Sequence, residues 1–416
     1  MSNYKSDFLN ILDRRGFIYQ GSDLEGLDAK LASERVSAYI GFDATARSLH
    51  VGNLAQIMML YWFQACGHQP ITLMGGGTSK IGDPSGKDSQ RKLLSDDEIE
   101  ANITGLKGVF GKFLDYEARD YAAIMVNNND WLADLNYLSF LRDYGRHFTI
   151  NRMLSFESVK TRLDREQPMT FLEFNYMILQ AYDFLELYRR YGVALQMGGS
   201  DQWGNIVNGT ELIRRVEGAA TYAMTCPLLT SASGHKMGKT AEGAVWLNAD
   251  MCSPYDYYQY WRNCEDADIG KLLRIFTTLP LPEIEELEQL EGRELNEAKK
   301  KLAYEATQLC HGEDAAQSAE ETARQTFEQG GAGSDLPTLD IEESALAEGI
   351  GFLDAAVQLG LAGSKGEARR TVKQGGARIN DTRIDDPDYA ITATDLQHGV
   401  VKISTSKKKH ALIRVI

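Results

Sequence analysis

The sequence lacks the features of secreted, membrane-embedded and metal-scaffolded proteins. No stretch approaches the roughly 20 consecutive apolar residues that a membrane helix needs. The N-terminal segment MSNYKSDFLN has no basic start, apolar run or small-residue cleavage site. Only five cysteines occur in 416 residues, scattered and without a CxxC pair, which argues against a disulfide framework or a zinc site. We therefore expect a cytoplasmic protein with no membrane contact and no protein-bound metal site.

Basic residues are also in deficit, but not uniformly. The chain has a net charge of −15, which speaks against general nucleic-acid binding. Residues 350–416 carry 11 Lys and Arg against 7 Asp and Glu, a net charge of +4, which leaves 33 basic and 52 acidic residues, or −19, elsewhere. A small basic tail on an acidic body suggests that the tail contacts phosphate, although a solvated basic face is the alternative.

Four short β-rich runs each lead into a polar or glycine-rich turn and then into a helical pattern. They are residues 37–42, 69–75, 122–126 and 193–197. This alternation predicts an α/β fold with a Rossmann-like, nucleotide-binding parallel sheet. Because ligands of such sheets bind at the carboxyl ends of the strands, we look for chemistry in the four turns.

The remainder predicts a helical region, a linker and a compact tail. Residues 252–329 have an almost wholly helical pattern, and GGAGSDLP at 330–337 is the clearest linker. The tail begins with a helical pattern and ends in short strands at 399–403 and 411–416. The length also favours two or three domains. We expect a catalytic domain over 1–230, a helical domain over 231–329, a linker over 330–348 and a small α+β domain over 349–416.

Two of the turns contain residues suited to phosphate. In YIGFDATARSLHVGN, a strand end and a glycine precede Thr45, His50 and Asn53 at the start of a helix, where anions are favoured. A histidine that merely caps the helix is the alternative. In the segment GGGTSKIGDPSGK, five glycines in twelve residues predict a loop that approaches a ligand, with Lys87 and Arg91 at its end. The spacing is not that of a P-loop, and a long solvent loop is the alternative.

Three more segments carry unusual polar residues. In YMILQAYDF, Tyr176, Gln180 and Asp183 share one helix face. Such a stripe is costly to bury unless it is paired, so a ligand is a reasonable partner, but a solvent-facing side fits the periodicity equally well. The segment GGSDQWGN follows the fourth β-rich run, and KMGKT at 236–240 is a small basic loop, which alone is a weak signal.

Together, in their order and spacing, these segments resemble the class I aminoacyl-tRNA synthetases and, within that class, the tyrosyl-tRNA synthetases. HVGN at 50–53 is similar to the HIGH-type motif, and KMGKT to the KMSKS-type loop. GFDATARSLHVGNL, IGDPSGK, YMILQAYDF and GGSDQWGN carry the closer likeness, which covers essentially the whole chain. The resemblance implies a homodimeric enzyme that activates L-tyrosine with ATP and transfers it to the 3′ end of tRNA(Tyr), with Mg²⁺ accompanying the ATP phosphates.

The same resemblance implies a role for each site residue. Thr45 and His50 would contact the outer phosphates in the transition state, and pyrophosphate would be enclosed by Lys87, Arg91, Lys236, Lys239 and Thr240. ATP would also be held by Gly41, Asp43 and Asn53, and its ribose by the Gly199 backbone and the Asp201 carboxylate. Asp83, Tyr176 and Gln180 would bind the α-ammonium of tyrosine, with Gln202 near its carboxylate. Tyr39 and Asp183 would meet its phenolic hydroxyl, as a buried hydrogen-bonding pair.

The tail resembles a small RNA-binding domain first recognised in a ribosomal small-subunit protein. The likeness lies in SKGEARR and VKQGGARIN, and it implies tRNA contacts by Arg369, Arg370, Lys373 and Arg378.

The chain departs from the family's motifs at four positions. Asn53 stands where a second histidine is frequent, Gly238 and Thr240 replace serines, and Ala44 replaces a frequent proline. These changes bear on rates more than on the reaction.

Two other functions are compatible with parts of this pattern. Tryptophanyl-tRNA synthetases share the architecture, but a Tyr39–Asp183 pair suits a phenol better than an indole. A non-catalytic RNA-binding protein built on a synthetase is the alternative from another class, and the intact His50, Lys236, Lys239 and Asp201 speak against it.

Overall fold

The computed structural model describes residues 3–85, 93–118, 120–234, 237–240, 243–327, 336–342, 346, 349–397, 399–406 and 409–415, with backbone alone at 157–158, 239–240 and 326–327. The chain forms two compact units. The first comprises residues 1–253 and 260–311, and the second comprises residues 254–259 and 312–416. Helix α11 (Pro254–Arg262) runs across this division. The finer boundaries expected at residues 230 and 349 stay predictions.

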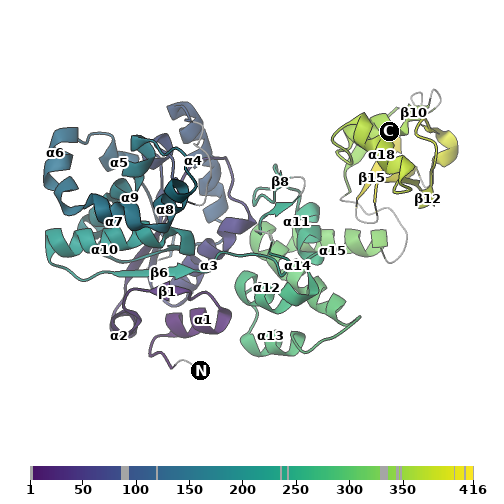
Figure 1. Ribbon diagram of the computed structural model, residues 1–416. Coiled ribbons are helices and arrows are strands. Elements are labelled where there is room, and N and C mark those ends of the chain that lie inside the picture. Colours follow the sequence, from purple (N-terminus) through teal and green to yellow (C-terminus); the bar gives the residue numbers. More distant parts are fainter. Residues whose placement is uncertain are drawn as a thin grey trace. The chain divides into compact units, whose positions relative to one another are not determined.

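A six-stranded sheet of order β1-β6-β5-β2-β3-β4 forms the centre of the first unit (Figure 1). Its strands are β1 (Gln20–Gly21), β2 (Ser37–Phe42), β3 (Gln69–Met74), β4 (Ile124–Asn127), β5 (Val193–Gly199) and β6 (Tyr222–Cys226). All neighbours pair in parallel except β1, which is antiparallel to β6. The predicted parallel sheet is therefore confirmed. The strand order reverses between β2 and β5, which makes the carboxyl ends of these two strands the expected ligand crevice.

Helices account for most of the remaining chain in this unit. They are α1 (Asp7–Arg15), α2 (Leu24–Ser33), α3 (Val51–Ala65), α4 (Asp96–Phe110), α5 (Asn129–Leu132), α6 (Tyr137–Asp143), α7 (Ile150–Ser155), α8 (Glu157–Asp164), α9 (Phe171–Tyr191), α10 (Trp203–Glu217), α12 (Ile269–Phe276), α13 (Leu281–Leu287) and α14 (Leu295–His311). The helical pattern predicted after residue 252 is confirmed. A two-stranded ribbon, β7 (Lys239–Thr240) with β8 (Gly243–Ala244), completes the unit.

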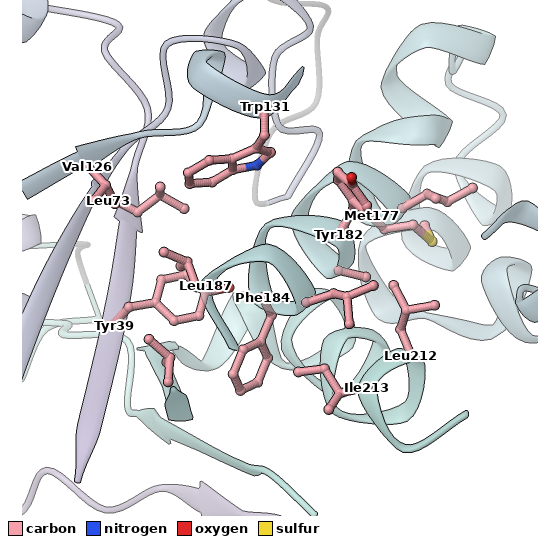
Figure 2. Packing of buried hydrophobic residues seen from close by; sticks show 14 of the residues in the cluster. Tyr39, Leu73, Val126, Trp131, Met177, Tyr182, Phe184, Leu187, Leu212 and Ile213 are labelled. Atoms are coloured by element: carbon pink, nitrogen blue, oxygen red, sulfur yellow. The ribbon is translucent and has the colours of Figure 1, made fainter. Parts of the chain in front are cut away.

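The core that positions the site lies between the sheet and helices α9 and α10 (Figure 2). Tyr39 from β2 and Leu73 from β3 pack with Phe184 of α9 and Ile213 of α10, all of them buried. Helix α9 has defined ends, with a capping box between Thr170 and Glu173 and the left-handed Gly192 as C-cap. Its register is therefore fixed, and with it the direction of the polar side chains that α9 contributes to the site.

The second unit is α+β. Strands β9 (Thr338–Ile341), β11 (Arg378–Ile379), β12 (Thr382–Arg383), β14 (Val400–Ser404) and β15 (His410–Val415) form a five-stranded sheet, and β10 (Ile350–Gly351) pairs with β13 (Ala390–Ile391). Its helices are α15 (Glu313–Phe327), α17 (Phe352–Gln358) and α18 (Lys365–Lys373). The strands predicted at 399–403 and 411–416 are confirmed as β14 and β15, but the prediction that the tail begins with a helix is wrong, because β9 and β10 precede α17. The predicted linker at 330–337 lies mostly outside the described residues. No helix within the described ranges is both long and apolar enough to cross a bilayer.

Candidate active site

A cavity of about 320 Å³ opens at the carboxyl ends of β2, β3 and β5. It is lined by most of the residues that the sequence nominates for tyrosine and ATP: Tyr39, Gly41, Asp43, Thr45, His50, Asn53, Asp83, Tyr176, Gln180, Asp183, Asp201 and Gln202. The parallel pairing of β2 with β3 and β5 brings these segments together although they lie far apart in the sequence. The crevice at the reversal of strand order is therefore occupied by polar side chains.

Four carboxylates line this cavity, whereas its described lining contains no lysine or arginine. Such a surface suits an ammonium group and opposes a triphosphate. Any cations that neutralise phosphate must therefore come from segments outside this described lining. Lys87, Arg91 and Lys236 lie outside the described residues, and the side chains of Lys239 and Thr240 are likewise not described.

Asp183 is a carboxylate held in a fully buried position at one end of the cavity. It accepts hydrogen bonds from Nδ2 of Asn128 at 3.0 Å and from Nε1 of Trp131 at 2.7 Å. Burial raises the pKa of Asp183 to about 7, against the opposing effect of these two hydrogen bonds. Asp183 can thus change its charge near neutral pH, which ties it to function more strongly than an ordinary core residue.

Tyr39 lines the same cavity, without a hydrogen bond to Asp183, and the expectation that the two meet the phenol of tyrosine stays a prediction. The Tyr39 side chain is buried, and its Oη has no hydrogen-bond partner among the described residues. Asp183 accepts hydrogen bonds from Asn128 and Trp131, which leaves its carboxylate able to accept from a further donor. Burial, followed by the nearby Asp183 charge, raises the pKa of Tyr39 well above its usual value. A neutral buried hydroxyl without a partner is costly to maintain, so this wall is suited to a ligand that supplies the missing hydrogen bond.

A hydrogen-bond chain connects this end of the cavity to Asp43. Asn128 Nδ2 also donates to Thr78 Oγ1 at 3.0 Å, and Thr78 Oγ1 donates to Asp43 Oδ1 at 2.8 Å. Tyr176 Oη donates to the other Asp43 oxygen at 3.1 Å. The Asp43 carboxylate is therefore fixed from two sides, and Tyr176 is held against the cavity by it.

Asp83, Gln180 and Gln202 form a second polar group. Gln202 Nε2 donates to Asp83 Oδ2 at 2.7 Å, and the Ser85 N–H donates to Asp83 Oδ1 at 2.9 Å. Gln180 is linked to this group through Asn205. Carboxylate and amide oxygens that face one cavity are the ligands an ammonium group requires.

His50 is the N-cap of α3, so the capping interpretation is confirmed, and phosphate binding by this residue stays a prediction. The ring Nδ1 of His50 accepts a hydrogen bond from the Gly52 N–H at 3.0 Å, and the backbone N–H of His50 donates to Asn53 Oδ1 at 3.3 Å. With Nδ1 accepting, the neutral ring carries its proton on Nε2. The cap thus fixes the tautomer of a histidine that lines the cavity. Asn53 has a structural role in the same cap, because its amide oxygen completes the capping box.

Gly238 of the KMGKT segment packs directly on the HVGN segment. Gly238 has φ +86°, and a Cβ added there would lie 2.5 Å from the Gly52 nitrogen. The two segments are tied by hydrogen bonds from Val51 N–H to the Val245 oxygen at 2.9 Å and from Val245 N–H to the Gly238 oxygen at 3.0 Å. A serine would clash here and adopt an unfavourable φ, which explains the departure at position 238.

One residue predicted to bind the nucleotide, Gly199, does not line the cavity, and several residues that do line it were not predicted. Gly199 ends β5 but is not part of the described lining, where Gly198 appears instead. The missed residues include Gln56, Thr78, Asn128, Gln196 and Trp246. Asn128 could have been found, because it follows β4 at the same sheet edge as the other turns. Trp246 could not, since its place beside the His50 ring, 6.1 Å between centroids, depends on tertiary pairing.

In the second unit, three of the four residues expected to contact tRNA are exposed on α18. Arg369, Arg370 and Lys373 face solvent, while Ala368 and Val372 on the opposite side of the helix are buried. Arg378 is half-buried on β11. The helix therefore presents a basic surface from a fixed register.

The chain matches two family profiles that together cover most of its length. Residues 31–328 match the tRNA synthetases of class I for tryptophan and tyrosine, and residues 327–413 match the C-terminal domain of tyrosine–tRNA ligases. The two matches meet just before the glycine-rich segment at 330.

Individual proteins are similar over comparable lengths. The tyrosine–tRNA ligase of Rhodospirillum rubrum is 59% identical over all of both chains, and that of Rhodopseudomonas palustris is 58% identical, again over all of both. A C-terminally truncated mitochondrial tyrosyl-tRNA synthetase of Aspergillus nidulans superposes with a TM-score of 0.70 and 31% identity, covering 77% of this chain and 94% of that one.

Proposed function

Since the chain belongs to the tyrosine–tRNA ligase family of class I aminoacyl-tRNA synthetases, we propose that the cavity described above is where tyrosine is activated. The carboxylate of tyrosine attacks the α-phosphorus of ATP, pyrophosphate leaves with Mg²⁺, and the tyrosyl group then passes to the 3′ end of tRNA(Tyr). The observation that carries this assignment is the buried Asp183 carboxylate beside Tyr39, whose Oη lacks a hydrogen-bond partner.

The phenol of tyrosine supplies what these two side chains lack. Its O–H donates to the Asp183 carboxylate as a third donor beside Asn128 and Trp131, and its oxygen accepts from Tyr39 Oη, which otherwise has no partner among the described residues. Phenylalanine leaves Tyr39 Oη unpaired and gives Asp183 no further donor, and an indole N–H offers a donor but no acceptor. The α-ammonium lies with Asp83, Tyr176 and Gln180, and Gln202 lies near the carboxylate.

Catalysis then requires positioning and stabilisation of charge that develops on phosphate, without a protein nucleophile. His50 donates through Nε2 to an outer phosphate, together with the Thr45 hydroxyl. Gly41, Asp43, Asn53, Gly199 and Asp201 hold the nucleotide. Lys87, Arg91, Lys236, Lys239 and Thr240 bring the positive charge that the described lining lacks, with Mg²⁺ on the phosphates as part of the substrate.

The basic tail binds tRNA. The exposed face of α18 supplies phosphate contacts that the acidic body does not. These contacts come from Arg369, Arg370 and Lys373, together with Arg378, which follows in the sequence. We assign residues 1–230 to catalysis, 231–329 to the helical domain on the anticodon side of tRNA, 330–337 to the linker and the residues that follow to this RNA-binding domain. The predicted linker over 330–348 is shortened because β9 (Thr338–Ile341) pairs with β15 in the sheet of the second unit. The five scattered cysteines, without a CxxC pair, fit the cytoplasm, where translation supplies the substrates.

The enzyme acts as a homodimer whose second copy covers an apolar surface on α6 to α9. Eight large apolar side chains are exposed over these consecutive helices, led by Tyr137 (58%), Leu138 (75%), Ile150 (59%) and Phe171 (69%). Such a concentration is unusual for a monomer, and a self-complementary patch is how two-fold dimers form. In sedimentation velocity, Phe171→Asp should convert dimer to monomer. A matched change at the exposed Tyr19, Tyr19→Asp, should leave the dimer intact.

Tyrosine-dependent exchange of label between pyrophosphate and ATP tests the assignment. The account predicts exchange with tyrosine and none with tryptophan. Exchange driven by tryptophan would favour the tryptophanyl enzyme, and its absence with every amino acid would favour a non-catalytic RNA-binding role.

A further inference from the structure

We infer that Asn205, which no assignment so far includes, is a positioning residue that orients the groups binding the α-ammonium of tyrosine. This inference rests on the proposed function, because it takes Asp83 and Gln180 as the ammonium-binding groups. Asn205 lies in the first turn of α10, and its side chain is buried. Its Nδ2 donates to Gln180 Oε1 on α9 and to Gln202 Oε1 in the turn Ser200–Gln202, both at 3.1 Å.

Through Asn205 the substrate groups become one connected chain. Gln202, once fixed by Asn205, donates its own Nε2 to Asp83 Oδ2 at 2.7 Å. A single amide on α10 therefore joins α9, the turn after β5 and the loop that carries Asp83. No other described side chain makes hydrogen bonds to both glutamines.

Asn205 determines which atom of each glutamine amide, oxygen or nitrogen, points toward it in this hydrogen-bond chain. An amide nitrogen has two N–H donors, and here each one is directed at a glutamine oxygen. Because Asn205 holds Gln202 by its oxygen, the Gln202 nitrogen is turned toward Asp83. Without two donors at position 205, either glutamine can rotate by half a turn and present N–H instead of oxygen. A reversed Gln202 would place its oxygen against the Asp83 carboxylate, and a reversed Gln180 would present donors to an ammonium group.

Local helix structure does not explain the contact with Gln180. An Asn near a helix start usually accepts a backbone N–H as a cap, but the N-terminus of α10 has no such side-chain cap. Asn205 instead donates, once to the N-cap residue Gln202 three positions earlier and once to Gln180 on α9. The helix itself provides a comparison in Asn208, one turn later. Asn208 is equally buried but lines a separate small cavity, and its Nδ2 has no partner among the described residues.

The test removes both donors without adding charge and uses truncated ligands as probes. Dissociation constants are measured for L-tyrosine, for tyramine, which lacks the carboxylate, and for 3-(4-hydroxyphenyl)propionate, which lacks the ammonium. Asn205→Leu should weaken tyrosine and tyramine roughly 10- to 100-fold, the range expected for misdirected buried hydrogen bonds. The propionate has no ammonium but keeps the carboxylate near Gln202, so it should weaken clearly less than tyramine does. The matched control, Asn208→Leu, should leave all three unchanged.

The pattern across ligands separates positioning from general damage. Asn205→Ser restores one donor and should give an intermediate, equally selective loss, and it carries the test if Asn205→Leu does not fold. An equal loss for all three ligands, no loss, or the same loss in Asn208→Leu would overturn the inference. Failure of the proposed function would look different: the unmodified protein would not bind tyrosine, or Gln180→Ala would weaken the propionate as much as tyramine.

Discussion

Asp183 should make tyrosine binding depend on pH near neutrality. Burial raises the pKa of Asp183 from 3.8 to about 7, so its neutral form predominates below pH 7 in the free enzyme. The phenol donates its hydrogen, and only the ionised carboxylate accepts it fully. Tyrosine binding should therefore select the ionised fraction, and the apparent dissociation constant is divided by that fraction.

The magnitude follows from the pKa. The dissociation constant of tyrosine should be flat above pH 7.5 and rise by about tenfold at pH 6 and about 100-fold at pH 5. Stability should change in the opposite sense to tyrosine affinity, and rise as pH falls. Between pH 4 and 7 the unfolded chain has released this proton while the folded chain still binds it, so the free energy of unfolding contributed by Asp183 falls as pH rises through that window.

Equilibrium dialysis of tyrosine from pH 5 to 8 measures the first effect, and Asp183→Asn is the control. The variant should bind tyrosine more weakly, and its affinity should no longer vary with pH, since the amide does not titrate. An affinity of the unmodified enzyme that stays constant from pH 5 to 8 would refute the reasoning, as would an unchanged slope in Asp183→Asn.

Further changes test the phosphate contacts, the packing of Gly238 and the tail one by one. Thr45→Ala and His50→Ala should slow formation of tyrosyl-adenylate at least tenfold in stopped-flow kinetics while tyrosine affinity stays within about twofold, because their partners are phosphates whose charge rearranges in the transition state; the same should hold for Lys239→Ala. A large loss of tyrosine binding with normal chemistry would contradict those roles. Gly238→Ala should also slow adenylate formation, since a Cβ there meets the Gly52 nitrogen at 2.5 Å; unaltered kinetics would show that this contact is not needed. Removing residues from Ser334 onward should spare pyrophosphate exchange and reduce tRNA charging by orders of magnitude through lost phosphate contacts, whereas an equal loss of both activities would indicate that the tail stabilises the fold.

Most of the sheet could be predicted because four of its strands are β-rich runs that can be recognised from the local sequence alone. Residues 37–42 form β2 as predicted, and the three other predicted runs all fall on strands of the sheet. Two strands escaped prediction. β1 has only two residues, and β6, with the sequence YAMTC, is not a clearly β-rich run, so their places depend on pairing with β5 and with each other.

Most of the site was predictable from motifs, but its hydrogen bonds were not. The motifs place Tyr39 and Asp183 at one cavity, yet they do not show that Asn128 and Trp131 occupy the carboxylate. That outcome depends on how α5, which follows β4, packs against α9. The same holds for Asn205, which sequence spacing places beside Gln202 without indicating that its amide reaches Gln180 on another helix.

Discrimination between tyrosine and phenylalanine reports on whether the phenol lies at Tyr39 and Asp183. The ratio of kcat/KM for the two amino acids in adenylate formation should be compared between the unmodified enzyme, Tyr39→Phe and Asp183→Asn. The account predicts a strong preference for tyrosine that falls at least about tenfold in each variant, because a buried hydrogen-bonding partner of the phenol is lost. A preference that is unchanged in both variants would contradict the placement of the phenol at Tyr39 and Asp183.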